Sequence, residues 1–119
     1  MSRNKQRGTR HETNVVNYLR QNGFPNAERR ALHGNNDRGD INAGPGLVIE
    51  CKSQARHSLA EWLDEAITEG ENANADVAAV WAHRRGKGNP GDHYVVTTGE
   101  IFMRLLRMAG FGDALEDNS

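Results

Sequence analysis

Residues 39–52 read GDINAGPGLVIECK and predict the β-hairpin on which the fold is built. Asp40 leads into a short strand, a glycine-rich turn occupies residues 43–46, and an apolar strand runs from Leu47 to about Ser53. Successive side chains of a strand point to opposite faces. The second strand therefore has two different faces, one formed by Leu47, Ile49 and Cys51 and the other by Val48, Glu50 and Lys52.

Two carboxylates meet across this predicted hairpin, because Asp40 begins its first strand and Glu50 lies within its second. Burial of an ionised carboxylate is costly unless the group is paired or holds a metal, and a second carboxylate beside it adds repulsion. A divalent cation resolves this conflict. Two carboxylates with main-chain carbonyls and waters suit Mg2+ or Mn2+. The alternative interpretation makes Glu50 and Lys52 an ion pair on a solvated strand face, with Asp40 opening a turn.

A third carboxylate, Glu12, lies in a helix predicted from about Thr9 to Asn22 and ended by Gly23. Glu12 precedes the apolar residues of this helix by three, four and seven positions, which directs its side chain toward the protein body. Thr9 and Glu12 also match a capping box, in which the glutamate accepts a hydrogen bond from the first amide of the helix. The spacing leaves both interpretations open.

Taken in chain order, the motifs that contain Glu12, Asp40, Glu50 and Lys52 resemble those of the PD-(D/E)xK nuclease superfamily. They are most similar to the small archaeal-type Holliday junction resolvases and to resolvase-like proteins of phages. The similarity covers about residues 7–110 and rests on order and spacing. The matching segments are Gly8 with Glu12, Tyr18-Leu19, Gly23-Phe24, Gly39-Asp40-Ile41 and Ile49-Glu50-Cys51-Lys52.

The resemblance implies a metal site made by the side chains of Asp40 and Glu50 and the main-chain carbonyl of Cys51. It also implies that Glu12 completes the site, directly or through water, and that Lys52 orients or activates the attacking water. Two features depart from the family: Gly39 replaces the usual proline, and residues 33–38 contain no serine in the loop where the archaeal enzymes have one.

The function that the resemblance implies is a Mg2+-dependent, structure-selective DNA endonuclease, for which Mn2+ is expected to substitute. Phosphodiester hydrolysis fits these residues, since a bound metal acidifies water and Lys52 adds a cation near the developing charge. We expect a Holliday junction resolvase that makes paired nicks as a homodimer, because a four-way junction has approximate two-fold symmetry. The alternatives are a nicking, repair or restriction-type nuclease of the same superfamily, or a non-catalytic DNA-binding module.

The charge of the chain is unevenly distributed. Residues 1–38 carry eight Lys/Arg and three Asp/Glu, a net charge of +5, whereas residues 39–119 carry seven and thirteen, a net charge of −6. Local basic patches neutralise phosphates even in a chain whose net charge is −1. The cations expected to bind DNA are Arg7, Arg10, Arg29, Arg30, Arg38, Arg84, Arg85 and Lys87. Each patch taken alone also fits a solvated surface or a disordered arm.

The chain length of 119 residues predicts one domain. The order helix, three strands, helix, two strands, helix predicts an α/β fold with a central mixed five-stranded sheet flanked by helices, restriction-endonuclease-like in the terms of the resemblance. We expect a basic N-terminal arm at residues 1–8, a nuclease domain at 9–110 and a frayed acidic tail at 111–119. No membrane segment or signal peptide is expected, and the single cysteine excludes an internal disulfide, so we expect a cytoplasmic location, in the host if the chain is phage-encoded. No small-molecule cofactor is expected.

The remaining pattern predicts strands at about residues 26–33, 77–82 and 94–97 and helices that begin at Ser58, with a capping box, and at Gly99. The outer face of the helix after Ser58 is expected to be acidic and to repel DNA, through Asp64, Glu65, Glu69 and Glu71. A mobile, glycine-rich loop is expected at residues 84–92. Cys51 is expected to be a buried packing residue. The five histidines show no zinc-ligand spacing, and most are expected on the surface or in loops.

Overall fold

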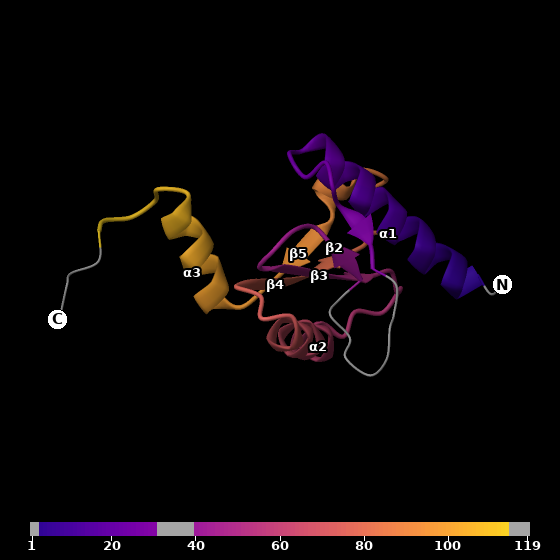
Figure 1. The fold of residues 1–119 in the computed structure, drawn as a ribbon. Coiled ribbons are helices and arrows are strands. Elements are labelled where there is room, and N and C mark those ends of the chain that lie inside the picture. Colours follow the sequence, from indigo (N-terminus) through magenta and orange to yellow (C-terminus); the bar gives the residue numbers. More distant parts are fainter. Residues whose placement is uncertain (1–2, 31–39, 115–119) are drawn as a thin grey trace.

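A mixed five-stranded sheet forms the centre of the computed structural model, which describes residues 3–30 and 40–114 (Figure 1). The strands lie side by side in chain order: β1 (Glu28–Arg29), β2 (Ile41–Asn42), β3 (Leu47–Lys52), β4 (Val77–Ala82) and β5 (Tyr94–Val96). β3 and β4 run parallel, and every other neighbouring pair is antiparallel. The expected α/β domain with a mixed sheet is confirmed.

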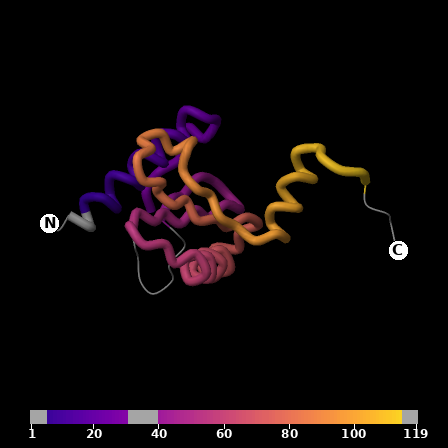
Figure 2. The backbone as a smooth tube through the Cα atoms, turned by 180° about the vertical axis from the view of Figure 1, so that it is seen from behind, coloured from indigo at the N-terminus to yellow at the C-terminus, as the bar shows by residue number. Residues whose placement is uncertain are grey.

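Two helices cover the two faces of this sheet, and a third projects from its end. The elements are α1 (Arg3–Gln21), α2 (Leu59–Asn72), a 3-10 turn η1 (Pro90–Asp92) and α3 (Gly99–Met108). α1 lies on one face and α2 on the other, while α3 extends away from both layers in the two opposite views (Figures 1 and 2). No helix within the described ranges is long and apolar enough to cross a membrane.

The alternation predicted for β3 gives the domain its two apolar layers. Ile49 and Cys51 pack with Val15 and Leu19 of α1 in one buried cluster. A second cluster is formed on the α2 side by Trp62, Ala66, Val80 and Ala82. The β2–β3 turn is possible because Gly44 and Gly46 have φ angles of +137° and +81°, which other residues rarely adopt. Ile41 pairs with Ile49 across this hairpin, so the register places Asp40 beside Glu50.

The expected helix start at Thr9 is wrong, because α1 begins at Arg3. The residues that precede Thr9 are mostly good helix formers, and the helix runs through Gly8 without a break. Residues 3–8 are therefore the first turns of α1 and do not form a separate arm. Thr9 lies inside the helix, so the capping-box interpretation of Glu12 is also wrong.

Two smaller expectations also need correction. Of the strand expected at residues 26–33, only Glu28–Arg29 is strand among the described residues 26–30, and residues 31–33 lie outside the described part of the chain. Ser58 precedes α2 at the N-cap position, but its side chain makes no capping hydrogen bond with the described residues. In the loop expected to be mobile, Trp81 Nε1 donates to the Pro90 carbonyl over 3.1 Å and Gly91 N donates to Asn89 Oδ1 over 2.9 Å.

Candidate active site

Asp40 is held by main-chain hydrogen bonds on both sides of β2. Its N–H donates to the Ile49 carbonyl over 3.1 Å, and its carbonyl accepts from Arg30 N over 2.7 Å. The side chain then continues toward β3, where Asp40 Oδ2 accepts from Cys51 N over 2.8 Å. The carboxylate thus takes the place of the next ladder bond between β2 and β3.

The Cys51 carbonyl points toward β2, on the same side of β3 as Asp40. Main-chain groups of alternate strand residues face the same neighbour, and both Ile49 C=O and Cys51 N–H face β2 and Asp40. The Cys51 side chain lies in the α1 cluster, so the expectation of a buried packing residue is confirmed. Burial and the nearby carboxylates raise the pKa of its thiol, which keeps it protonated.

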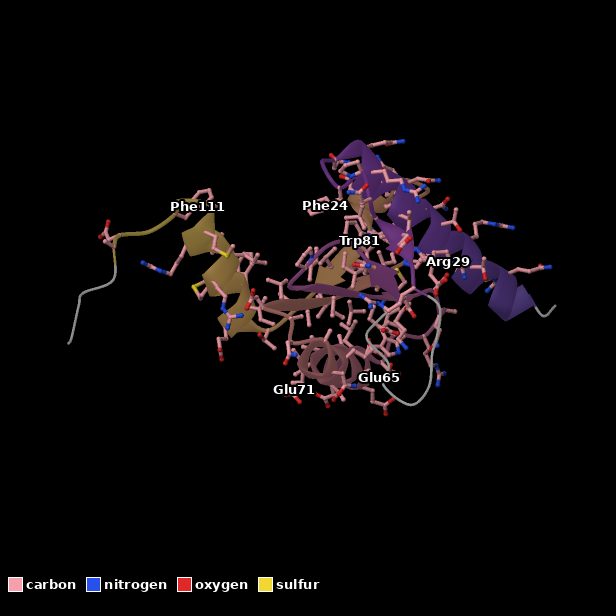
Figure 3. The ribbon with its side chains drawn as sticks, in the orientation of Figure 1. Phe24, Arg29, Glu65, Glu71, Trp81 and Phe111 are labelled. Atoms are coloured by element: carbon pink, nitrogen blue, oxygen red, sulfur yellow. The ribbon has the colours of Figure 1, made fainter. Side chains whose placement is uncertain are left out.

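Glu50 is buried, with 5% of its surface exposed, on the face of the sheet that α2 covers. Lys52 Nζ lies 3.7 Å from Glu50 Oε1 and 2.8 Å from Glu65 Oε2 on α2. The expected ion pair between Glu50 and Lys52 is present, but the burial of Glu50 shows that the expected solvated strand face is wrong. Figure 3 shows Glu65 in the α2 layer, so this acidic helix contributes to the site.

Burial and neighbouring carboxyls raise the pKa values of Asp40 and Glu50, although the hydrogen bond with Asp40 works to lower that of Glu50. Burial, followed by the charge of Glu50, raises the pKa of Asp40 to about 8. Burial, followed by a hydrogen bond and charge repulsion from Glu69, raises the pKa of Glu50 to about 9. Burial works to lower the pKa of Lys52, but its hydrogen bond to Glu65 and the nearby carboxylates outweigh it and raise that pKa, so the side chain is a cation.

Glu69 is the site residue that the sequence analysis missed. It was assigned to the solvated outer face of its helix, yet it is buried against Glu50. Its spacing carried the signal, because Glu69 follows Trp62 by seven residues and Ala66 by three, which places it on the apolar stripe of α2.

Glu12 lies on the other side of the sheet, in an ion pair with Arg29. Its Oε2 atom is 2.8 Å from Arg29 Nη2 and accepts from Arg29 Nε over 2.9 Å. The charge of Glu12 also contributes to the raised pKa of Asp40, so Glu12 is near enough to Asp40 to interact with it electrostatically. Arg29 lies on β1 beside α1 (Figure 3). The pair leaves Arg29 partly neutralised, so it is a weaker candidate for DNA binding than the sequence suggested.

Four of the expected DNA-binding cations, Arg7, Arg10, Arg84 and Arg85, line one pocket of about 680 Å3, together with Tyr94 and other polar residues. We call it the basic pocket. α1, which begins at Arg3, and the loop after β4 thus bring together two basic patches that are far apart in the sequence. Ser53, the residue after Lys52 in the sequence, also lines the basic pocket.

The other expected DNA-binding cations are placed differently. Arg30 lines a separate pocket of about 550 Å3 beneath the β2–β3 turn. Lys87 is not among the residues of the basic pocket, and its main-chain carbonyl accepts from His93 Nε2 over 2.7 Å. Arg38 lies outside the described residues.

Three of the histidines converge, although their spacing suggested no site. His11 is buried, and its Nε2 donates to the Trp81 carbonyl over 2.8 Å. Its ring centroid is 5.7 Å from that of His83 and 5.4 Å from that of His93, and the latter two are 4.6 Å apart. Burial lowers the pKa of both His11 and His83. The expectation of a surface or loop position is therefore wrong for His11.

Among residues 3–30 and 40–114, no group of three or more histidine, cysteine, aspartate or glutamate side chains is arranged to hold a metal ion. A Mg2+ site needs fewer, because this ion is usually bound by one or two carboxylates with waters completing the shell. Glu50 Oε2 is buried and has no hydrogen-bond partner among the residues that the structure describes. A buried oxygen without a hydrogen-bond partner, beside a second carboxylate, fits a site that binds a hard divalent cation better than it fits a metal-free protein core.

Comparison with known proteins adds no assignment: no protein-family model, curated protein or solved structure matches this chain.

The raised pKa values predict an unusual dependence of stability on pH in metal-free buffer. Both groups bind protons more tightly in the folded state than in the unfolded chain, where their pKa values are about 4. Their contribution to stability is therefore complete below about pH 4 and is lost as the pH rises toward 8 to 9. We expect Asp40→Asn and Glu50→Gln each to reduce this loss between pH 5 and pH 9. Urea unfolding at a series of pH values measures it, and identical slopes in wild type and both variants would contradict it.

Proposed function

We propose that this protein is a Mg2+-dependent endonuclease that acts on branched DNA, in the manner of a Holliday junction resolvase. The observation that carries the proposal is the half-buried Asp40 beside the buried Glu50, with the Lys52 cation 3.7 Å from Glu50. Such a set is expensive to maintain for stability alone, since the paired acids and their desolvation oppose folding near neutral pH. The basic pocket supports a polyanionic substrate.

Each residue of the site has a role in this proposal. Asp40, Glu50 and the Cys51 carbonyl would hold the metal, and Glu12 would complete the site directly or through water. When bound, the metal supplies Lewis-acid chemistry and lowers the pKa of a water molecule. Lys52, fixed by Glu65 at 2.8 Å, orients the attacking water and stabilises negative charge in the transition state. The arginines of the basic pocket bind the phosphates that flank the cleaved bond.

A two-fold dimer would supply the two matched nicks that a junction requires, and α3 is the surface that we assign to it. Only Ile101 of α3 is buried, whereas Phe102 is 51% exposed, Met103 52% and Met108 75%. Antiparallel pairing of two copies of α3 would place Glu100 of one copy near Arg107 of the other, which complements charge as well as covering apolar surface.

The catalytic proposal predicts large losses of cleavage with little loss of binding. Asp40→Asn, Glu50→Gln and Lys52→Ala should each lower the rate at least about a hundredfold, because each removes a metal ligand or the cation at the transition state. Affinity for DNA measured in Ca2+ should stay within a few-fold.

The assay compares four-way, Y-shaped, flap and linear duplex DNA with and without Mg2+. Asp64→Asn, which removes an exposed carboxylate from the same helix as Glu65, is the matched control and should cleave like wild type. Normal cleavage by any of the three site variants would refute the site. Cleavage of all four substrates at one rate would favour a general nuclease, and tight binding without cleavage would favour a DNA-binding module.

Glu12 is tested against its ion-pair partner. If Glu12 serves the metal, Glu12→Gln should abolish most of the activity, whereas Arg29→Gln should retain it, since only the first change removes a potential ligand. If the Glu12–Arg29 pair has a structural role, both variants should lose similar amounts of stability and activity per folded molecule should be unchanged. Thermal unfolding and the junction assay on the same samples separate the two outcomes.

The dimer proposal predicts a particle of twice the chain mass at micromolar concentration. Light scattering coupled to size exclusion measures this mass. Phe102→Glu should yield a folded monomer that makes single nicks in place of paired ones, because it places a charge in the apolar contact between the two α3 helices. Phe24→Glu, at an exposed phenylalanine near the end of α1, should remain a dimer. A wild-type monomer, both free and bound to DNA, would contradict the proposal.

A further inference from the structure

The basic pocket contains aromatic side chains in addition to the cations that phosphate binding requires. Its four arginines come from α1 and from the loop after β4, and none of the residues that line it is acidic. Its wall also includes aromatic surface, at Tyr94 on β5 and at His57 in the connection between β3 and α2. Cations alone would suffice for a duplex backbone, so the aromatic wall calls for a separate explanation.

Tyr94 lies where an incoming planar group can reach it. Tyr94 is 45% exposed, although it lies on β5 of the sheet. The Arg84 guanidinium lies 5.6 Å from the centroid of its ring, and the His57 ring lies 5.7 Å from it, nearly edge-on. Tyrosine, arginine and histidine are the side chains on which unstacked nucleobases stack in proteins that bind single strands.

The dimensions of the basic pocket are compatible with a single nucleotide. A volume of about 680 Å3 is in the range of pockets that bind small organic molecules. A base inside a duplex shows only its edges, because its faces are covered by its neighbours. Only a base that has left the stack presents the face that Tyr94 requires.

We propose that the basic pocket binds one unpaired nucleotide of a DNA strand, with the base against Tyr94 and the flanking phosphates on the arginines. The inference rests on the proposed action on DNA and makes its substrate class specific. Strands with unpaired nucleotides, such as those at a branch point, a flap or a single-stranded tail, are then preferred to continuous duplex. Ser53, which follows Lys52 in the sequence, is one of the residues that line the pocket.

Fluorescence anisotropy in EDTA tests this proposal without cleavage. It measures the affinity for two labelled ligands, a single strand of eight deoxythymidines and a blunt duplex of eight base pairs. We expect wild type to bind the single strand at least about fivefold more tightly than the duplex. Tyr94→Ala should weaken single-strand binding by roughly five- to hundredfold, the usual effect of losing one stacked base. Tyr94→Phe keeps the ring and should stay within twofold. Duplex binding should change less than twofold in both variants.

Phe24→Ala is the matched control, since it removes an exposed aromatic ring that lies outside the basic pocket. It should leave both affinities unchanged. Equal losses for single strand and duplex in Tyr94→Ala, or no loss for either, would overturn the proposal. Circular dichroism establishes that each variant is folded.

A measurement on the unaltered protein keeps the test independent of folding. A single strand that carries one 5-iododeoxyuridine should crosslink to Tyr94 under ultraviolet light, as mapped by mass spectrometry. Crosslinking only to residues outside the basic pocket would overturn the inference. Cleavage of junctions with no role for Tyr94 would remove this inference alone, whereas Tyr94-dependent binding with no Mg2+-dependent cleavage would remove the nuclease proposal alone.

Discussion

The hydrogen bond from Cys51 N to the Asp40 carboxylate is the interaction on which the site depends. At this point a side chain replaces a main-chain bond between two strands, and the position of the carboxylate is thereby set by the sheet itself. The neighbouring residue on β3, Glu50, is held by the same strand. The register of the β2–β3 hairpin therefore places the main chains of the two acids opposite each other.

That arrangement is stable only because apolar layers enclose it. The α1 cluster on one face and the α2 cluster on the other hold β3 in place, although β3 carries a buried acid. The raised pKa values of Asp40 and Glu50 reflect the cost of this enclosure. A protein that needed only stability would gain from apolar residues at these positions, which is the physical reason to assign the pair to function.

The two faces of the sheet also divide the charge. α2 contributes Glu65 and Glu69 beside Glu50 and Lys52, while α1 contributes Arg7 and Arg10 to the basic pocket. A net charge of −1 therefore conceals an acidic cluster on the α2 side and a basic pocket on the α1 side.

The sequence by itself determined the elements whose patterns are local. Alternation at residues 47–52, the glycine turn before them and the helical spacing after Ser58 specified β3, the hairpin and α2, and with them the proximity of Asp40, Glu50 and Lys52. Only the tertiary structure decided that Glu69 faces Glu50, that His11 meets His83 and His93, that Arg29 pairs with Glu12 and that α3 stands apart with Phe102 exposed. The physical reason is that periodicity states which residues share a face of one element, whereas these contacts depend on which face of another element packs against it.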